Sequence, residues 1–339
     1  MKDKVIFFSI DRLGDYLIRS NVINIISKNY NFKEIICSEK NLNLIKTQKH
    51  FDKINLFNTN YSIYNKFIYL FKFSFKKYDS VIVFDGKNIS NLLLFCIRAK
   101  FKFTFIYKKK GLINNLLFNI KKILLNKCKI NFNIIYNRDL IELDNKDHYP
   151  TKYKKLKKYY ENITEETYYF NEEKILEYNN NTLHDYILIH LDEKIIDIKG
   201  INDNLNSCIE NLCKNTKKKI IITSFNNHYD YYKNLQFKKI DFLNLNLKSI
   251  LYEEIVIIEN IPLENFYYFI KNSFINISCH SGFFIHTSLL LNKKSIDIIN
   301  KKDEKWLNTW TPITKNYRKV YKSSVIQVFN SLIEVINEK

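Results

Sequence analysis

The chain has 339 residues, of which 46% are hydrophobic types, and a formal net charge of +19 at pH 7. This length favours about two domains, and no apolar run approaches the ~20 residues that cross a bilayer. The short apolar run near the N-terminus is followed at once by Asp and Arg, so it predicts a first β-strand rather than a signal peptide.

The positive charge comes mainly from lysine, in a chain that is rich in Lys, Asn, Ile, Phe and Tyr. Arginine, which forms the bidentate contacts to bases and phosphates, is scarce. We therefore expect no nucleic-acid partner, but a weak attraction to an anionic membrane surface. The six cysteines form no CxxC pair and follow no export signal. They indicate a reduced, cytoplasmic protein, which could lie peripherally on the inner face of the plasma membrane.

Short β-rich runs alternate with longer helical runs through the first 125 residues. We predict strands at 4–10, 33–38, 52–57, 79–85 and 102–107. We predict helices at 16–27, 41–50, most of 62–76, 89–98 and 112–125. Continuous apolar strands that alternate with helices indicate a parallel sheet with helices on both faces.

The pattern weakens between about 128 and 183, where the chain is charged, Tyr-rich and Asn-rich. One helix is predicted there, at 151–162. We place the boundary between two domains in this region. The expected N-terminal domain is 1–165, the linker is about 166–179, and the C-terminal domain is 180–339.

The alternation then restarts. We predict strands at 186–191, 218–224, 254–260, 274–278, 295–299 and 317–322. We predict helices at 205–213, 228–236, 263–271, 284–291 and 325–336, the last of which could pack back on the N-terminal domain. The expected fold class is therefore α/β, with two Rossmann-like parallel-sheet domains facing a central cleft.

The stretch "SIDRLGDYLIRS" (9–20) connects the first strand to the first helix. The carboxyl end of a parallel strand faces the ligand site in such sheets. Asp15 has two interpretations: a helix N-cap, with Gly14 easing the turn, or a carboxylate base. Asp11 is a second candidate carboxylate in the same loop. The loop is not GxGxxG, which disfavours a dinucleotide site.

Two strand ends in the second half carry polar residues. "IHLDEK" (189–194) places Lys194 where it could pair with a diphosphate, or in a solvated charged loop. "ITSFNNHYD" (222–230) places Thr223 and Ser224 at a strand end, as possible ligand contacts or as part of a capped helix start.

The stretch "ISCHSGFFIHTS" (277–288) connects a predicted strand to a predicted helix and contains one of only five glycines. His280, Ser281 and Gly282 lie at the turn. Free N–H groups and the positive end of a helix make such a turn an anion site, where glycine allows a phosphate close approach. His286 is either a further ligand contact or a buried structural histidine. The sequence has no Asp-x-Asp, HExxH or P-loop pattern, so we expect no metal site and no cofactor.

These motifs together resemble the heptosyltransferase-like glycosyltransferases, glycosyltransferase family nine. The likeness lies in Gly14-Asp15 after the first strand, in "YDSVIVFDGKNIS" (78–90), and in the late His-Ser-Gly with a downstream His. His286 follows Gly282 by four residues, whereas the family spacing is three. The resemblance implies a GT-B fold with an acceptor-binding first domain and a donor-binding second domain.

The resemblance also implies roles for individual residues. Asp15 would be the catalytic base. The expected donor-binding residues are Lys194, Thr223, Ser224, His280, Ser281, Gly282 and His286. The expected acceptor-binding residues are Asp11, Arg12, Gly14 and Asp85.

The function expected from the resemblance is inverting, metal-independent transfer of a heptose or other hexose-like sugar. The donor would be a nucleoside-diphosphate sugar, and the acceptor a lipopolysaccharide or other surface glycan or glycolipid. Two alternatives remain: a nucleotide-sugar epimerase of similar layout, and a catalytically inactive GT-B protein that binds glycan.

Overall fold

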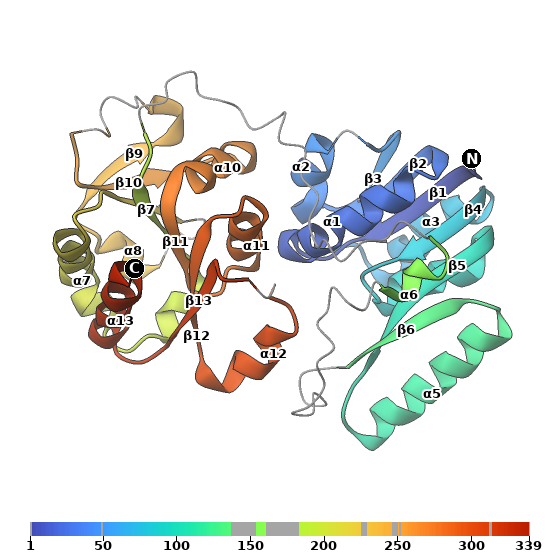
Figure 1. The fold of residues 1–339 in the computed structure, drawn as a ribbon. Helices are drawn as coiled ribbons and strands as arrows, with labels where there is room; N and C mark the ends of the chain where they lie inside the picture. The colour runs from blue at the N-terminus through green and yellow to red at the C-terminus, as the bar shows by residue number, and fades with distance from the viewer. Residues whose placement is uncertain are drawn as a thin grey trace. The chain divides into compact units, whose positions relative to one another are not determined.

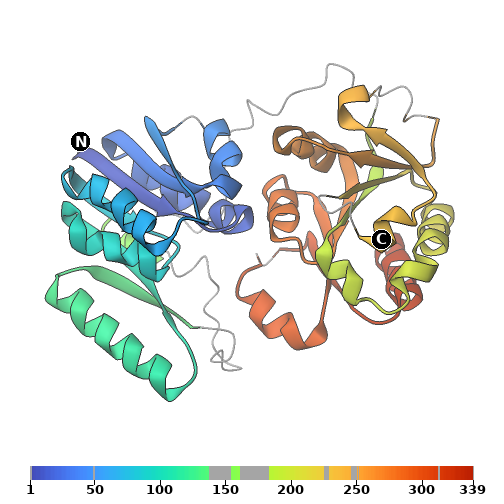
Figure 2. The same cartoon turned by 180° about the vertical axis from the view of Figure 1, so that it is seen from behind.

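The computed structural model describes residues 2–48, 50–136, 154–160, 183–224, 229–245, 250, 252–311 and 314–338. The chain divides into two compact units: the first comprises 1–171 with 308–310, and the second comprises 172–307 with 311–339. Each unit is built around one parallel β-sheet with helices on both faces (Figures 1 and 2). This confirms the fold class predicted from the alternation of strands and helices.

The sheet of the first unit has the strand order β3-β2-β1-β4-β5-β6, and all its described pairings are parallel. Its strands are β1 (Lys2–Ser9), β2 (Tyr30–Ser38), β3 (Lys53–Phe57), β4 (Lys77–Val83), β5 (Arg98–Lys108) and β6 (Asn131–Tyr136). Its helices are α1 (Leu13–Ser27), α2 (Glu39–Thr47), α3 (Ile63–Ser74), α4 (Asn88–Cys96), α5 (Leu112–Lys127) and the short α6 (Lys154–Lys157).

The strand order places the helices on opposite faces of this sheet. From β1 the chain moves outward to β2 and β3, then returns to β4 and continues to β5 and β6. Because parallel crossovers are right-handed, α1 and α2 cover one face while α3, α4 and α5 cover the other. A single apolar core forms beneath the second group, and it includes Leu70 of α3, Leu94 of α4, and Phe118 and Leu125 of α5.

The sheet of the second unit has the order β13-β12-β11-β7-β8-β10-β9. Its strands are β7 (Tyr186–Leu191), β8 (Ile220–Ser224), β9 (Lys238–Asp241), β10 (Ile255–Glu259), β11 (Ser273–Ser278), β12 (Lys294–Ile299) and β13 (Tyr317–Tyr321). Its α-helices are α7 (Ile201–Thr216), α8 (Asp230–Lys233), α10 (Leu263–Asn272), α11 (Gly282–Leu290), α12 (Glu304–Asn308) and α13 (Val325–Asn337).

The final helix α13 packs against α7 and β13, within the second unit (Figure 1). Its apolar side chains Val325, Val328, Phe329 and Leu332 belong to the core of that unit. A capping box at Ser324 and Gln327 begins the helix, so its start is encoded locally.

Most predicted elements are present, with shifted ends. The sequence missed β6, β9 and α12, whose patterns are short or interrupted by polar residues. The helix predicted at 228–236 is only α8, and the helix predicted at 151–162 contains α6. Residues 158–160 follow α6 without continuing the helix. Residues 151–153 and 161–162, the linker at 166–179 and the predicted domain ends at 165 and 180 lie outside the described residues.

Candidate functional site

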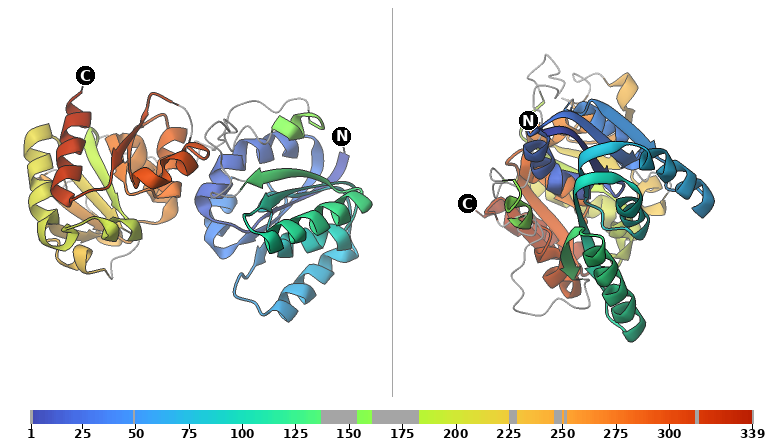
Figure 3. Two further views of the ribbon diagram at one scale, coloured as in Figure 1. Left: turned by 90° about the horizontal axis from the view of Figure 1, so that it is seen from below. Right: turned by 90° about the vertical axis from the view of Figure 1, so that its right-hand side faces the viewer.

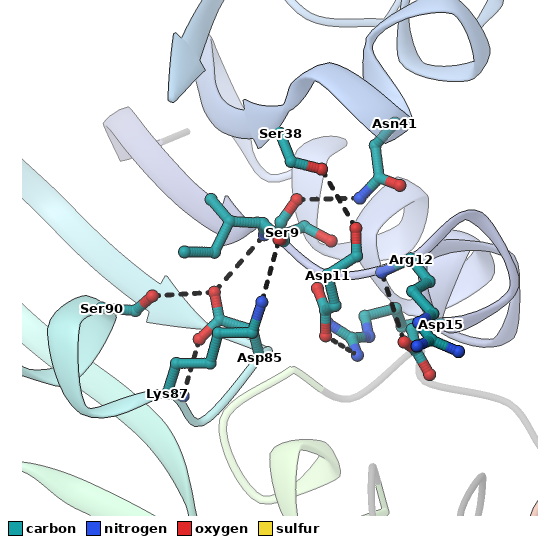
Figure 4. A network of polar contacts seen from close by, with 11 residues as sticks. Ser9, Asp11, Arg12, Asp15, Ser38, Asn41, Asp85, Lys87 and Ser90 are labelled. Carbon is teal, nitrogen blue, oxygen red and sulfur yellow. Dashed lines mark hydrogen bonds and ion pairs between the residues drawn. The ribbon is translucent and has the colours of Figure 1, made fainter. Parts of the chain in front are cut away.

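Each unit has a cluster of polar side chains at the carboxyl ends of its parallel strands. The first cluster follows β1 and β4 and contains Asp11, Asp15 and Asp85 (Figure 4). In open α/β sheets the loops at this edge hold ligands. The cluster therefore lies where a catalytic group could reach a substrate.

Asp15 lies in the first turn of α1 but is not its N-cap. The helix begins at Leu13 with Arg12 as N-cap, and the carboxylate of Asp15 accepts the backbone N–H of Arg12 at 3.3 Å. The helix begins at Leu13, three residues before the start predicted from the sequence at 16. The N-cap interpretation is thus wrong in position, although Asp15 does satisfy an N–H group at the helix start.

The environment of Asp15 raises the pKa of its carboxyl above the ordinary value. Burial is the largest cause, because a desolvated carboxylate is less stable than the neutral acid. The negative charge of Asp11 acts in the same direction, whereas Arg19 and Arg12 lower the pKa of Asp15. A carboxylate with a raised pKa is a better proton acceptor, as a general base requires.

Asp11 forms a bidentate ion pair with Arg19 of α1. The two N–O distances are 2.6 and 3.2 Å, and Arg19 is 1% exposed. Arg19 was not among the site residues predicted from the sequence. The sequence could have indicated Arg19 by its spacing, because Arg19 follows Asp15 by four residues on α1 and residues four apart lie on one face of a helix. The pair ties the loop before α1 to the helix that carries Asp15.

Asp85 has an internal role in the structure. It is buried, accepts hydrogen bonds from Ser90 Oγ and the N–H of Lys87, each at 2.8 Å, and accepts a longer one from Ile10 N at 3.4 Å. Lys87 Nζ donates to the oxygen of Ile10 at 3.1 Å. These contacts tie the loop after β4 to the end of β1 (Figure 4). Burial and the charge of Asp11 raise the pKa of Asp85 to about 6.

The second cluster lies around the turn from β11 into α11. His280 has a left-handed backbone, with φ of 54°, an uncommon conformation for a residue other than glycine. Asp297 of β12 holds it there: its carboxylate accepts the backbone N–H of His280 at 2.8 Å, and its other oxygen lies 2.7 Å from Nδ1. Tyr317 Oη donates to the same carboxylate at 2.8 Å.

Asp297 was not among the predicted site residues, although its place in the sequence pointed to a special role. It stands inside the apolar strand "SIDII" and is 0% exposed. A carboxylate in such a strand needs hydrogen-bond donors, which implies a functional or structural contact. Here the donors belong to the turn before α11.

Lys194 reaches the same turn from the loop after β7. Its Nζ donates to the main-chain oxygen of His280 at 2.6 Å. Its own backbone is held in turn: the carboxylate of Asp192 accepts its N–H at 2.8 Å, and Lys322 Nζ donates to its carbonyl oxygen. The ammonium group is therefore positioned beside the start of α11.

Gly282 is the first residue of α11, with Ser281 as N-cap. No side chain caps this helix end. The backbone of Gly282 is not left-handed, and a Cβ added there would meet no heavy atom within 4 Å. The conformation of the turn therefore does not itself require a glycine at position 282. The space above it suits a ligand that approaches the first N–H groups of the helix.

Thr223 and His190 lie beneath this edge rather than on it. His190 Nδ1 and Thr223 Oγ1 are 3.0 Å apart, and both side chains are buried. Burial lowers the pKa of His190 to about 3, so the ring is neutral. The ring stacks on Phe284 of α11, with centroids 5.2 Å apart. The contact between His190 and Phe284 anchors α11 to the sheet. Ser224, at the end of β8, is by contrast partly exposed.

His286 is one turn inside α11 and only 4% exposed. The structure therefore favours the interpretation of His286 as a buried structural histidine. No group of three or more His, Cys, Asp or Glu side chains that could hold a metal ion occurs among the described residues. In that same part of the chain, no helix is both long and apolar enough to cross a bilayer.

No protein-family model matches the chain, and no curated protein sequence matches it. Solved structures do match over nearly the whole length. The Escherichia coli heptosyltransferase WaaC with ADP-2-deoxy-2-fluoro heptose has a TM-score of 0.65 at 12% identity, covering 98% of both chains. A glycosyl transferase family 9 structure from Veillonella parvula has a TM-score of 0.57 at 10% identity, covering 98% of this chain and 89% of that one.

A structure of UDP-GlcNAc 2-epimerase from Methanocaldococcus jannaschii has a TM-score of 0.56 at 15% identity, covering 99% of this chain and 93% of that one. The protein therefore has the GT-B fold. This confirms the fold that the resemblance to the heptosyltransferase-like glycosyltransferases implies. At these identities the likeness extends to the architecture alone.

Proposed function

We propose that the protein is an inverting, metal-independent glycosyltransferase. It moves a heptose or other hexose-like sugar from a nucleoside-diphosphate donor to a lipopolysaccharide or other surface-glycan acceptor. Support comes from the GT-B fold, shared with a heptosyltransferase solved with an ADP-heptose analogue, and from the two polar clusters. All six cysteines are free, which suits a protein of the reducing cytoplasm.

In this proposal Asp15 is the general base. Its carboxylate accepts the proton of an acceptor hydroxyl as the hydroxyl oxygen attacks the anomeric carbon. The bond between that carbon and the diphosphate oxygen breaks on the opposite face of the sugar, and the nucleoside diphosphate leaves with the electron pair. The raised pKa of Asp15 supports this role.

The leaving diphosphate would lie against the start of α11. The N–H groups of its first turn and the positive end of the helix dipole favour an anion there. Lys194 adds a full positive charge beside them. His280, Ser281 and Gly282 form the turn that the phosphates would contact, and Ser224 lies at a neighbouring strand end. Thr223 and His286 are buried beneath this turn, so they would position it rather than contact the donor.

The acceptor would bind near the start of α1. Arg12 is exposed and could contact it directly, next to Gly14 in the first turn. Asp11 and Asp85 already have partners within the unit, so we assign them the positioning of this loop.

The observation that carries the proposal is the open space above Gly282 with the ammonium of Lys194 beside it. Isothermal titration of the full chain with ADP, UDP and GDP, and with the matching monophosphates, tests it. We expect at least one diphosphate to bind about 10-fold tighter than its monophosphate, because the second phosphate gains charge-assisted contacts. Equal or absent binding across the panel would refute a diphosphate site.

A nucleotide-sugar epimerase is the second candidate, favoured by the similarity to UDP-GlcNAc 2-epimerase. Incubation with nucleotide sugars in the absence of any acceptor separates the two enzymes. An epimerase converts the sugar without acceptor, whereas a transferase leaves it intact or slowly hydrolyses it. A GT-B protein that only binds glycan would neither convert nor transfer the sugar.

A further inference from the structure

The outer surface of α3, α4 and α5 is apolar. These helices cover one face of the first sheet (Figure 3) and bury side chains such as Phe73 and Leu125 against it. Large hydrophobic side chains also point away from the sheet, including Ile63 (72% exposed), Leu112 (89%) and Leu116 (61%). We call this surface the α3–α5 face.

Helix α5 shows the pattern most clearly. Leu112, Leu116, Ile120 and Ile123 recur every three or four residues on its exposed side. Phe118, on the opposite side, is buried in the core. A surface helix of a globular protein normally carries polar residues on its outer face, whereas a helix that is apolar all round is buried or meets lipid. The exposed stripe of α5 therefore needs a partner.

The three helices share a hollow of about 550 Å³. Phe67 and Phe71 of α3, Leu92 and Phe95 of α4, and Leu124 of α5 line it, with no charged side chain among its lining residues. A polar ligand would find few hydrogen-bond partners there. The hollow suits hydrocarbon instead.

The charges around this face are of one sign. Residues 86–136 contain no Asp or Glu, and exposed lysines in this stretch include Lys109, Lys110 and Lys122. Exposed apolar area of this extent marks an interaction site. A second copy of the chain would bring like charges together, whereas an anionic bilayer offers both hydrocarbon and negative headgroups.

We propose that the α3–α5 face docks on an anionic lipid bilayer, with α3 and α5 lying in the plane of the interface. The apolar stripe enters the boundary between headgroups and acyl chains, and the lysines contact the headgroups. The proposal is independent of the catalytic residues, so it can fail while the proposed function holds, and the reverse.

Flotation of the full chain with vesicles tests the proposal. One vesicle contains phosphatidylcholine alone, and the other contains about one third phosphatidylglycerol. We expect binding to the anionic vesicle to be at least about 10-fold tighter, and to weaken as salt rises, because salt screens the headgroup attraction.

Two variants locate the surface. Leu116→Gln/Leu117→Gln/Ile120→Gln removes exposed apolar groups from α5, and Lys109→Glu/Lys110→Glu/Lys122→Glu reverses three charges. Each should reduce binding to the anionic vesicle about 10-fold or more, with an unchanged melting temperature, since all these side chains are exposed.

Matched controls lie in the second unit. Leu243→Gln/Tyr252→Gln/Ile326→Gln removes three exposed apolar groups, and Lys214→Glu/Lys302→Glu/Lys305→Glu makes the same change in net charge. Both should bind like the parent. An equal loss in the charge control would show attraction by net charge alone, and an equal loss in the apolar control would show that the α3–α5 face is not specific; either result would overturn the proposal. An absence of binding to the anionic vesicle would also overturn the proposal.

Discussion

The Nζ of Lys194 donates a hydrogen bond to the main-chain oxygen of His280 at 2.6 Å, across 86 residues of sequence. Lys194 lies just after β7, and His280 lies just before α11. Because β7 and β11 pair in parallel, their carboxyl ends meet at the same edge of the sheet. A cation and a helix N-terminus are thereby placed side by side, the combination that an anionic leaving group requires.

Lys194→Met should weaken binding of the preferred nucleoside diphosphate by about 10-fold or more, because it removes a charged donor and keeps most of the apolar stem. Isothermal titration measures the affinity. Lys214→Met, at an exposed position on α7, is the control and should bind like the parent. Unchanged affinity of Lys194→Met would remove this lysine from the donor site.

Asp15→Asn should reduce the rate of sugar transfer by about 10²–10⁴-fold, the usual cost of losing a general base. The fold should persist, since the amide oxygen of Asn can still accept the N–H of Arg12. Asp203→Asn is a matched control, because Asp203 occupies the equivalent third position of α7. A transfer rate for Asp15→Asn equal to that of the control would leave Asp15 as a structural residue.

The acidic limb of the pH–rate profile should lie above the ordinary pKa of an aspartate. A base acts when deprotonated, so kcat/KM falls as the pH drops through the pKa of Asp15, which its surroundings raise. Asp11→Asn removes a negative charge that contributes to the rise, so the limb should move to lower pH. Asp230→Asn, far along the chain on α8, should not move it. A limb at unchanged pH in Asp11→Asn would argue against Asp15 as the titrating group.

Gly282→Val should abolish measurable binding of the nucleoside diphosphate while the melting temperature stays close to that of the parent. The added side chain enters open space and strains no left-handed backbone, yet it occupies the approach to the helix end. Gly86→Val is the contrasting variant. Gly86 has φ of 62°, and its Cβ would lie 2.7 Å from Tyr107, so that variant should lose stability. Full binding by Gly282→Val would place the donor elsewhere.

Sugar transfer should persist in EDTA. The proposal assigns the negative charge of the leaving group to Lys194 and the start of α11, rather than to a divalent cation. The transfer assay with and without chelator measures this directly. Activity that disappears in EDTA and returns with Mg²⁺ or Mn²⁺ would contradict the metal-independent mechanism.

The sequence by itself determined the architecture. Apolar runs such as 186–191 and 274–278 have the length and composition of buried parallel strands, and helical runs separate them, so local periodicity was enough to predict two α/β units. Elements whose hydrophobic periodicity is weak were not predicted from the sequence. For example, β9 (Lys238–Asp241) has only four residues, and most of them are polar. Its place at the edge of the sheet depends on its pairing with β10.

Only the tertiary structure decided how the candidate sites are built. The pairing of Asp11 with Arg19, the support of His280 by Asp297, and the position of Lys194 depend on contacts between strand ends. The backbone conformations of two glycines were also decided there: Gly86 has a left-handed backbone, whereas Gly282 does not. Periodicity reports which face of an element is buried. Which side chains meet at the edge of a sheet depends on strand order, and strand order is a property of the whole fold.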